Sequence, residues 1–374
     1  MKVLVFLLAL LTSGFCSAGA AAVRYVSPGA AGDGRGGSAA NAADFLDAKF
    51  WSEVQNALKK ESVTVKFLAG DYVRAYTEKP LILDKMGNPN NILVLEGEPL
   101  RTVFTVPEGK AQKPVIIDVK NSENIQILNF SFTGSGKLGY ALRITSTANG
   151  ITKNILVKDC HWTDMRGIIY GATGAHQKGT SDITYKNCTF KRVGIDSHSH
   201  FMYHAYSSSN ITVLDSYFED CTGDYVRFRA NCDYGTVKGS TFVRNEKFPV
   251  YPFISVPLFN NVDPGDETFA TNYTFTGNKF KNTKNAIAFH HYGFDPAGYH
   301  YLLNEQEGNI LTTGTDEQKR NLLLNNFKIN LDRVKVAKNT YSEITSKVVV
   351  GSFPNYGAKT RGWKGWADIS SLIN

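Results

Sequence analysis

Apolar and polar residues alternate in a nine-residue segment that recurs along the chain. Each copy has apolar residues two apart and an aromatic residue at its ninth place, and the first five copies begin 30, 28, 28 and 24 residues apart. Alternation with period two predicts β-strands, and a repeat of this length predicts strands stacked turn upon turn. The copies begin at Asn124, Asn154, Asp182, Asn210, Tyr234, Asn272 and Arg333, and end at Phe132, Trp162, Phe190, Phe218, Phe242, Phe280 and Tyr341.

The sixth place of the segment is polar or glycine, as a bend stacked from turn to turn requires. It holds Asn129, Asp159, Asn187, Asp215, Gly239 and Gly277. The seventh place is small in four copies, with Cys160, Cys188, Ser216 and Ser240. We therefore expect Cys160 and Cys188 to fill a column between coils rather than to bind a metal.

A second apolar pair follows the segment in several repeats, at Leu142/Ile144, Val226/Phe228 and Ile287/Phe289. Two or three short strands per repeat, with no helix between them, predict a parallel β-helix. Leucine-rich repeats need a Leu-x-x-Leu-x-Leu pattern that is missing here, and propeller blades are longer. The chain is thus expected to be all-β, with residues 21–374 forming a single parallel β-helix domain and acting as a monomer.

Other segments are expected to close the solenoid and to wall a groove. Apolar residues at helical spacing predict a capping helix over about residues 41–60, with Asn41 or Asp44 as its N-cap. Residues 351–374 are expected to close the other end, with Trp363 and Trp366 as packing residues. The long intervals 246–271 and 292–331 are expected to be loops along one side of a groove.

The N-terminus has the pattern of a secretory signal. Lys2 precedes an apolar run at residues 3–11, and the small residues at 18–20 fit a cleavage site. Cys16 follows Phe15, which fits a lipoprotein signal poorly. Export with removal of residues 1–20 is therefore predicted, and no later segment is long and apolar enough to span a bilayer.

Charge and cysteine content limit the partners. The formal net charge is +7, and the leader contributes one of the basic residues. A modest positive excess in an exported protein suits an acidic polysaccharide such as alginate, pectate or a glycosaminoglycan, and is too small to favour nucleic acid. Four cysteines follow the leader without a zinc-type pair, and Cys221 and Cys232 could form a disulfide or remain buried thiols.

Basic and aromatic residues gather in two neighbouring repeats, at residues 196–206 and 224–229. If Val226 and Phe228 face the core, Tyr225, Arg227 and Arg229 point outward together. For residues 196–206, two assignments of the inward-facing and outward-facing side chains, called registers below, remain open. In one, Phe201, Tyr203 and Ala205 face inward, and His198, His200, His204 and Tyr206 line the surface. In the other, Met202 faces inward and Tyr203 lies outside. By the repeat, Arg143 is equivalent to Arg227, and His290 to Arg229.

This set of residues suits β-elimination from a uronate. The reaction needs a cation to neutralise the carboxylate, a base to take the proton of carbon 5, and an acid for the leaving oxygen. Arginine, histidine and tyrosine suit these tasks in that order. We predict Arg227 and Arg229 as the clamp, with base and acid roles open among His200, Tyr203 and His204. Further substrate contacts are expected from Arg143, Tyr225, His290, His291 and Tyr292.

Two features resemble a known group of proteins. The opening Tyr-Val-Ser-Pro and Gly-Asp-Gly of residues 25–34, and coils of the form Asn-Ile-x-Val-x-Asp/Asn-x-x-Phe, are similar to the pectin-lyase-like superfamily. The resemblance covers about residues 23–350 and implies a right-handed parallel β-helix. The superfamily includes polysaccharide lyases, glycoside hydrolases, esterases and uronate epimerases, so the resemblance is specific for fold and not for reaction.

Metal and carboxylate alternatives remain open. The resemblance brings in calcium, for which Glu219, Asp220 and Asp224 are candidates that would equally suit a solvated turn. Zinc could use His198, His200 and His204. A glycoside hydrolase would need two facing carboxylates, for which Asp164, Asp196 and Asp224 are available.

One motif points to epimerases. Tyr292-Gly-Phe-Asp295-Pro296 is similar to the Tyr-Gly-x-Asp-Pro-His signature of alginate carbon-5 epimerases, with Ala297 in place of their catalytic histidine. His291 or His300 would have to replace it. The sequence favours an exported polysaccharide lyase, with an epimerase, a glycoside hydrolase or a non-catalytic glycan-binding solenoid as alternatives.

Overall fold

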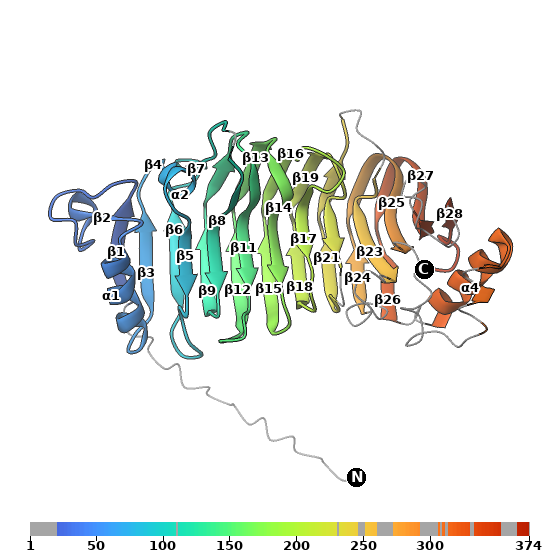
Figure 1. Cartoon of the computed structure of the whole chain (residues 1–374), viewed down its shortest axis with the longest axis horizontal. Coiled ribbons are helices and arrows are strands. Elements are labelled where there is room, and N and C mark those ends of the chain that lie inside the picture. The colour runs from blue at the N-terminus through green and yellow to red at the C-terminus, as the bar shows by residue number, and fades with distance from the viewer. Residues whose placement is uncertain are drawn as a thin grey trace, which may run out of the picture.

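The computed structural model describes residues 21–109, 111–229, 232–245, 251–259, 272–291, 306, 309–310, 313–329, 333–352 and 365–373. Within them the chain winds into stacked coils, and Figure 1 shows the strands of successive coils side by side along the long axis. In the middle of the chain, from β3 to β23, each coil contributes one strand to each of three faces. This is the parallel β-helix that the repeat predicts.

The first face is an 11-stranded sheet whose strands all pair in parallel. In order across the sheet, they are β2 (Ala43–Asp44), β1 (Ala22–Ser27), β3 (Val63–Phe67), β6 (Leu93–Gly97), β9 (Glu123–Leu128), β12 (Thr152–Lys158), β15 (Thr180–Lys186), β18 (Ser209–Leu214), β21 (Gly235–Lys238), β24 (Tyr273–Thr276) and β26 (Val334–Ala337).

The other two faces share long strands at the C-terminal end. The second face holds β4 (Gly70–Asp71), β7 (Thr102–Thr105), β10 (Ser131–Thr133), β13 (His161–Met165), β16 (Thr189–Val193), β19 (Tyr217–Cys221) and β22 (Thr241–Val243). The third holds β5 (Leu81–Asp84), β8 (Lys113–Lys120), β11 (Leu138–Thr145), β14 (Ile168–His176), β17 (His200–His204), β20 (Val226–Phe228) and β23 (Ile254–Phe259). β25 (Lys279–His291) pairs with strands of both faces and with β27 (Thr340–Ser352).

Each nine-residue segment is two strands that meet at a bend, and not the single strand that alternation alone predicts. β15 ends at Lys186 and β16 begins at Thr189, with Asn187 between them at φ 54°. The other sixth-place residues also have positive φ, which Asn, Asp and Gly tolerate best. The Asn187 amide donates a hydrogen bond to the Asp159 side chain of the preceding coil. The predicted stacked bend is therefore confirmed.

The ninth-place aromatic residues form a continuous stack inside the solenoid. The ring of Trp162 lies 4.5 Å from that of Phe190, which lies 4.9 Å from that of Phe218. The seventh place behaves as predicted too, because the Cys188 backbone N–H donates to Ser216 Oγ at 3.1 Å and the Phe130 N–H to Cys160 Sγ at 3.4 Å. These columns link coil to coil and fix the register of the outer faces.

Further elements lie beside the first and the last coils of the solenoid. Helix α1 (Ala48–Leu58) buries Phe50, Trp51, Val54 and Leu58, and Figure 1 shows it beside the first coils. Its N-cap is Asp47, whose side chain accepts from the Lys49 N–H. The predicted start was too early, because residues 39–41 form a short 3-10 helix, η1 (Ala39–Asn41), and Asp44 lies in β2. At the other end, β28 (Gly365–Asp368) pairs antiparallel with β27.

The two long intervals are not simple loops. The first contains β23, and the second contains helix α4 (Asp316–Ile329), while the rest of both lies largely outside the described residues. Another short helix, α2 (Arg74–Thr77), precedes β5. None of the helices in the described ranges is long and apolar enough to cross a membrane.

Candidate active site

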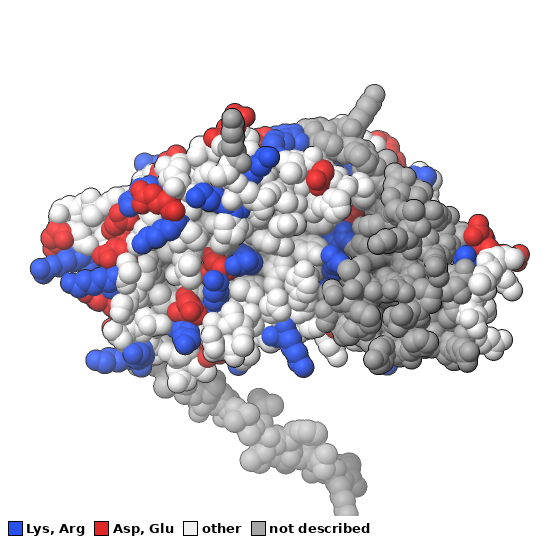
Figure 2. Space-filling view, in the orientation of Figure 1, with Lys and Arg blue, Asp and Glu red and all other residues white. Residues whose placement is uncertain are grey.

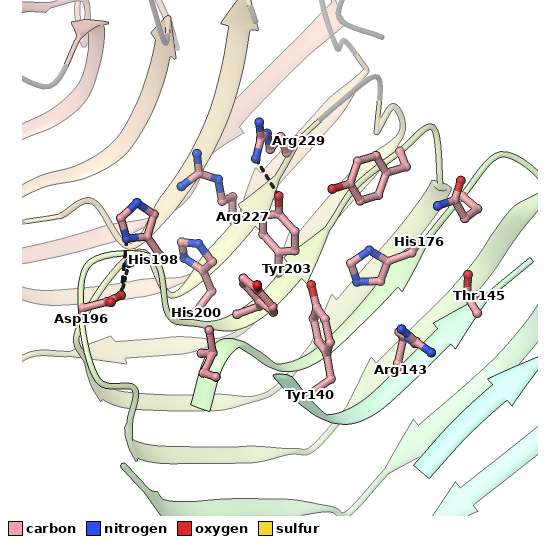
Figure 3. A pocket seen from close by; sticks show the side chains of 14 residues that line it. Tyr140, Arg143, Thr145, His176, Asp196, His198, His200, Tyr203, Arg227 and Arg229 are labelled. Carbon is pink, nitrogen blue, oxygen red and sulfur yellow. Dashed lines mark hydrogen bonds and ion pairs between the residues drawn. The ribbon is translucent and has the colours of Figure 1, made fainter. Parts of the chain in front are cut away.

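A cavity of about 830 Å³ lies on the third face, over four neighbouring strands. Strands β11, β14, β17 and β20 are consecutive in the sheet, so they bring together residues from 140 to 229. Figure 3 shows the side chains that converge on it. The lining residues are Tyr140, Arg143, Thr145, Ile169, Tyr170, His176, Gln177, Asp196, His198, His200, Tyr203, Tyr206, Arg227 and Arg229.

One outward-facing column crosses the floor of this cavity. Arg143 pairs with Gly174, and Tyr203 pairs with Arg227. Gly174 follows Thr173, which pairs with Met202, so the column runs Arg143, Gly174, Tyr203, Arg227. The predicted equivalence of Arg143 and Arg227 is confirmed. A Cβ at Gly174 would lie 2.0 Å from the Tyr203 carbonyl oxygen, so this position has room only for hydrogen.

The alternation of side chains breaks in the middle of β17. Phe201 and Met202 are adjacent in sequence, yet both are buried in the main core. The break leaves His200 and Tyr203, three positions apart, on the cavity face together. Each of the two open registers is thus right for part of the strand, and the pairing of Met202 with Val226 fixes the second part.

His200 carries a hydrogen bond that orients its ring. Its Nδ1 lies 3.2 Å from the backbone carbonyl oxygen of Asp224, to which only a protonated nitrogen can donate. Nε2 then keeps its lone pair. Burial, together with the positive charge of Arg227, lowers the pKa of His200 well below its ordinary value. The neutral imidazole is therefore the form present near neutral pH, and it can accept a proton.

Tyr203 lies beside His200 and contacts a cation. The Arg229 guanidinium donates a hydrogen bond of 2.9 Å to the phenolic oxygen of Tyr203 (Figure 3). A cationic donor at this oxygen stabilises negative charge that develops when the phenol gives up its proton. Tyr203 is thus placed to act as an acid next to the histidine base.

Arg227 is held by a buried carboxylate. Its Nη1 lies 3.1 Å from Asp224 Oδ2, which also accepts a 2.6 Å hydrogen bond from Ser255. Asp224 is completely buried, and this burial raises its pKa. The described lining of the cavity holds three arginines and one aspartate, Asp196, and this excess of positive charge suits an anionic substrate.

Two predicted site residues lie in the core. His204 is fully buried, its Nδ1 accepts from the Ala175 N–H at 3.2 Å, and burial lowers its pKa to about 3. Tyr225 is also fully buried, and its hydroxyl donates to the Val243 carbonyl at 2.8 Å. The surface position that the first register gives His204 is wrong, because β17 breaks alternation and follows the second register from Met202 onward. The surface position of Tyr225 is wrong because β20 begins only at Val226, so Tyr225 precedes the alternating strand.

The third-face strand β14 supplies cavity residues that the sequence reasoning missed. His176 and Tyr170 come from it, and Tyr140 comes from β11. Gly and Ala occupy much of β14, so it shows no apolar alternation and was not recognised as a strand. The available signal was its place in the repeat, between the copies that begin at Asn154 and Asp182.

Three residues predicted to contact the substrate lie wholly or partly outside the described part of the structure. The side chains of His290 and His291 and all of Tyr292 lie outside the described residues, as do Ala297 and His300. The backbone of His290 pairs with Pro257, and Ser255 pairs with Arg227, so His290 occupies the strand position expected from its equivalence with Arg229.

The candidate metal ligands do not form a metal site. Among the described residues, no three His, Cys, Asp or Glu side chains are placed to hold a metal ion. Asp220 Oδ1 accepts from the Asn245 N–H at 2.7 Å, Asp224 holds Arg227, and Glu219 accepts from the Tyr217 hydroxyl at 2.5 Å. The calcium candidates thus do not fit the ion, and the zinc set is split because His204 faces the core while His198 is exposed.

The candidate hydrolase carboxylates are also separated. Asp196 lines the cavity, where it lies 3.5 Å from His198, but Asp224 is buried behind Arg227. Asp164 forms a two-bond ion pair with Arg192 and does not line the cavity. The described lining of the cavity therefore contains a single carboxylate.

All four described cysteines are buried free thiols. Cys221 Sγ donates to the Ser199 carbonyl at 3.3 Å, while Cys232 Sγ lies 3.4 Å from Ser208 Oγ. A Cys221–Cys232 disulfide is therefore wrong, and the alternative of buried thiols is confirmed.

Comparisons with known proteins support the fold. No family model and no curated protein matches the sequence. The structure is similar to that of the pectate lyase Pel9A, with a TM-score of 0.51, 11% identity, and coverage of 72% of this chain and 68% of that chain. The GH136 lacto-N-biosidase from Eubacterium ramulus gives a TM-score of 0.48 at 10% identity, covering 71% of this chain and 57% of that one. At 11% identity, the likeness to Pel9A shows the fold alone, and this fold is the parallel β-helix that the resemblance to the pectin-lyase-like superfamily implies.

Proposed function

We propose that the protein is an exported lyase that cleaves a uronic-acid-containing anionic polysaccharide by β-elimination. The observation that supports this most directly is the stacking of His200 on Tyr203 within a cavity that also holds Arg227 and Arg229. These residues supply a base, an acid and cations within one site. Export rests on the signal pattern of residues 1–20.

The reaction follows from these groups. An arginine clamp on the uronate carboxylate makes the proton of carbon 5 more acidic, because it stabilises the charge that develops there. His200 Nε2 takes that proton, and the electron pair of the carbon–hydrogen bond forms the double bond between carbons 4 and 5. The bond from carbon 4 to the glycosidic oxygen breaks, and the leaving oxygen receives the proton of Tyr203. Proton exchange with water then restores both side chains.

Other reactions on this fold have less support from the described residues. A glycoside hydrolase requires two carboxylates across the sugar, and the described lining holds one. A carbon-5 epimerase begins with the same proton abstraction but returns a proton to the opposite face of the ring. A binding protein would need neither the histidine nor its orienting hydrogen bond. No calcium step is included, because the three candidate carboxylates do not fit a calcium site.

The test is the ultraviolet absorbance of the unsaturated product during incubation with alginate, pectate, chondroitin, hyaluronan, heparan or ulvan. A rise with one polymer would establish elimination and identify the sugar. New reducing ends without absorbance would indicate hydrolysis, and exchange of the carbon-5 proton without cleavage would indicate epimerisation. Either result would overturn the lyase proposal. A parallel incubation with chelator is expected to keep full activity.

A further inference from the structure

His176 presents a buried nitrogen to the cavity. The residue ends β14 and is 5% exposed, and its Nε2 makes no hydrogen bond with any described residue. Burial, aided by the positive charge of Arg143, lowers the pKa of His176 to about 3, so the ring is neutral. A buried polar atom without a partner destabilises the folded protein, because it has lost its hydrogen bonds to water. A ligand group that forms this hydrogen bond would remove the penalty.

The nitrogen lies close to the strand at Gly174. A Cβ at Gly174 would come within 2.9 Å of His176 Nε2, so the glycine lets the imidazole approach the sheet. Gly174 separates Arg143 from Tyr203 along the column, so His176 lies between the cation on one side and the candidate acid on the other. All three side chains line the cavity, so a hydrogen-bonding nitrogen and a cation meet at one part of its lining.

Aromatic rings enclose the same place. The ring of His176 lies 4.9 Å from that of Tyr140, edge to face (Figure 3). It also lies 5.9 Å from the ring of Tyr206. Tyr140 also packs 5.9 Å from Tyr170 at the cavity wall. Tyrosine rings present flat apolar surfaces on which the carbon–hydrogen faces of a sugar can pack, while hydroxyl groups remain available for polar contacts.

The surroundings of Arg143, the cation beside His176, keep a net positive charge. Arg143 binds the buried Asp118 through two hydrogen bonds, of 3.1 and 2.6 Å, and Lys120 lies 3.0 Å from the same carboxylate. Two cations on one carboxylate leave a net positive charge for an anion in the cavity. Figure 2 shows acidic and basic side chains intermixed over the first coils and fewer charged side chains over the middle ones.

We propose that the cavity contains a second subsite beside His176 and Arg143. There, a hydroxyl group of a neighbouring acidic sugar of the polymer forms a hydrogen bond with His176, while Arg143 attracts the carboxylate of that sugar. This inference rests on the proposed function for the class of substrate. Arg143 and Arg227 are three strand spacings apart, about 14 Å, which exceeds the width of one sugar ring. The substrate is therefore a chain with acidic groups on more than one sugar, and not an isolated uronate at the end of a neutral glycan.

The test compares wild type with His176→Phe, which keeps an aromatic ring and removes the nitrogen. Titration calorimetry measures the binding of saturated uronate oligosaccharides, from disaccharide to hexasaccharide. The oligosaccharides are made from the polymer that the protein cleaves. If it cleaves none, oligosaccharides of each acidic polymer are tested in turn. We expect His176→Phe to weaken the binding of long oligosaccharides about fivefold to tenfold and to change that of disaccharides little. His161→Phe, a half-buried histidine on the second face, is the matched control.

The outcomes separate this inference from the lyase proposal. Elimination with unchanged long-chain binding by His176→Phe would overturn the second subsite alone. Binding that depends on His176 without any elimination would overturn the lyase alone. Failure of wild type to bind any acidic oligosaccharide would overturn the subsite. Circular dichroism and the urea midpoint show whether each variant is folded, and Arg143→Lys, which retains a cation for Asp118, provides a second variant expected to weaken long-chain binding.

Discussion

The imidazole of His200 and the phenol ring of Tyr203 are stacked, with centroids 5.3 Å apart and planes inclined by 11°. The two rings come from one strand, three residues apart, because Phe201 and Met202 both turn into the core. A proton acceptor and a proton donor thus face the same side of the cavity floor. This pairing has a direct consequence for activity.

Removing either functional atom should abolish most of the turnover. Tyr203→Phe keeps the stacked ring but removes the hydroxyl, and His200→Gln removes the base. General acid–base groups contribute about a hundredfold to ten-thousandfold, so each variant should lose kcat by that factor. The rate of unsaturated product formation measures it. Tyr234→Phe, at an exposed tyrosine outside the cavity, is the control, and a Tyr203→Phe enzyme with wild-type kcat would rule out the acid role.

The activity should persist into weakly acidic solution. Burial and the charge of Arg227 depress the pKa of His200 below 6.5, so the base stays unprotonated until the pH falls below that value. The acid limb of kcat/KM is therefore expected below pH 6.5, and a limb above it would contradict the role of His200. The pH profile of initial rates on the identified polymer decides between them.

The buried His204 should make the fold sensitive to acid. Its pKa is about 3 in the folded protein against an ordinary 6.5, so between these values the unfolded chain binds an extra proton and stability falls as the pH falls. One such group contributes a slope of up to about 1.4 kcal/mol per pH unit. His204→Phe, placed between the rings of Tyr185 and Phe228, should flatten the pH dependence of urea unfolding.

A matched histidine tests that interpretation. The side chain of His198 is exposed, so it is solvated in the folded and the unfolded chain alike. His198→Gln should leave the slope of stability against pH as in wild type. Equal slopes in wild type and His204→Phe would mean that the buried imidazole does not drive acid unfolding.

The buried ion pair should matter more for stability than an exposed one. Asp224→Asn leaves the buried Arg227 without its counter-charge and should cost about 3 kcal/mol. Asp164→Asn breaks the half-exposed pair with Arg192 and should cost less than about 1 kcal/mol. Urea denaturation measures the free energy of unfolding of both variants. Equal losses of stability in the two variants would contradict the greater cost expected for breaking the buried Arg227–Asp224 pair.

The four buried thiols should be unreactive in the native protein. Burial raises the pKa of Cys221 and of Cys232 to about 12, so little thiolate is present at neutral pH. A thiol reagent should label none of the four described cysteines before unfolding and all of them in urea. Reductant should leave the thermal midpoint unchanged, whereas a drop would indicate a disulfide.

The repeat carried most of the fold information. Sixth-place Asn and Asp predicted the bends, because that role depends on chemistry that a single position displays. The ninth-place aromatics marked the repeat, and the structure shows that they also form an internal stack. The first residue of α1 was harder to predict from the sequence. Asn41 and Asp44 have side chains that can cap a helix, but Asn41 lies in η1 and Asp44 lies in β2. Asp47, three residues after Asp44, is the N-cap of α1.

The positions of the site residues were harder to predict than the fold, because they depend on where the alternation of side chains breaks. His200, Tyr203, Arg227, Arg229 and Arg143 were predicted from composition and register, and the structure brings them into one cavity. His204 and Tyr225 were misplaced because strict alternation fails at Met202 and before Val226. Such breaks depend on how neighbouring coils pack, which no local pattern of apolar residues records.

The stacking of coils sets the geometry of the cavity from outside it. Arg143 and Arg227 belong to coils separated by two others, so their separation is a whole number of strand spacings. An additional coil inserted between β14 and β17 would move the two arginines apart by about 4.8 Å without changing a single contact of either one with its own carboxylate. Related solenoids could therefore select longer or shorter spacings of acidic groups simply by gaining or losing a repeat.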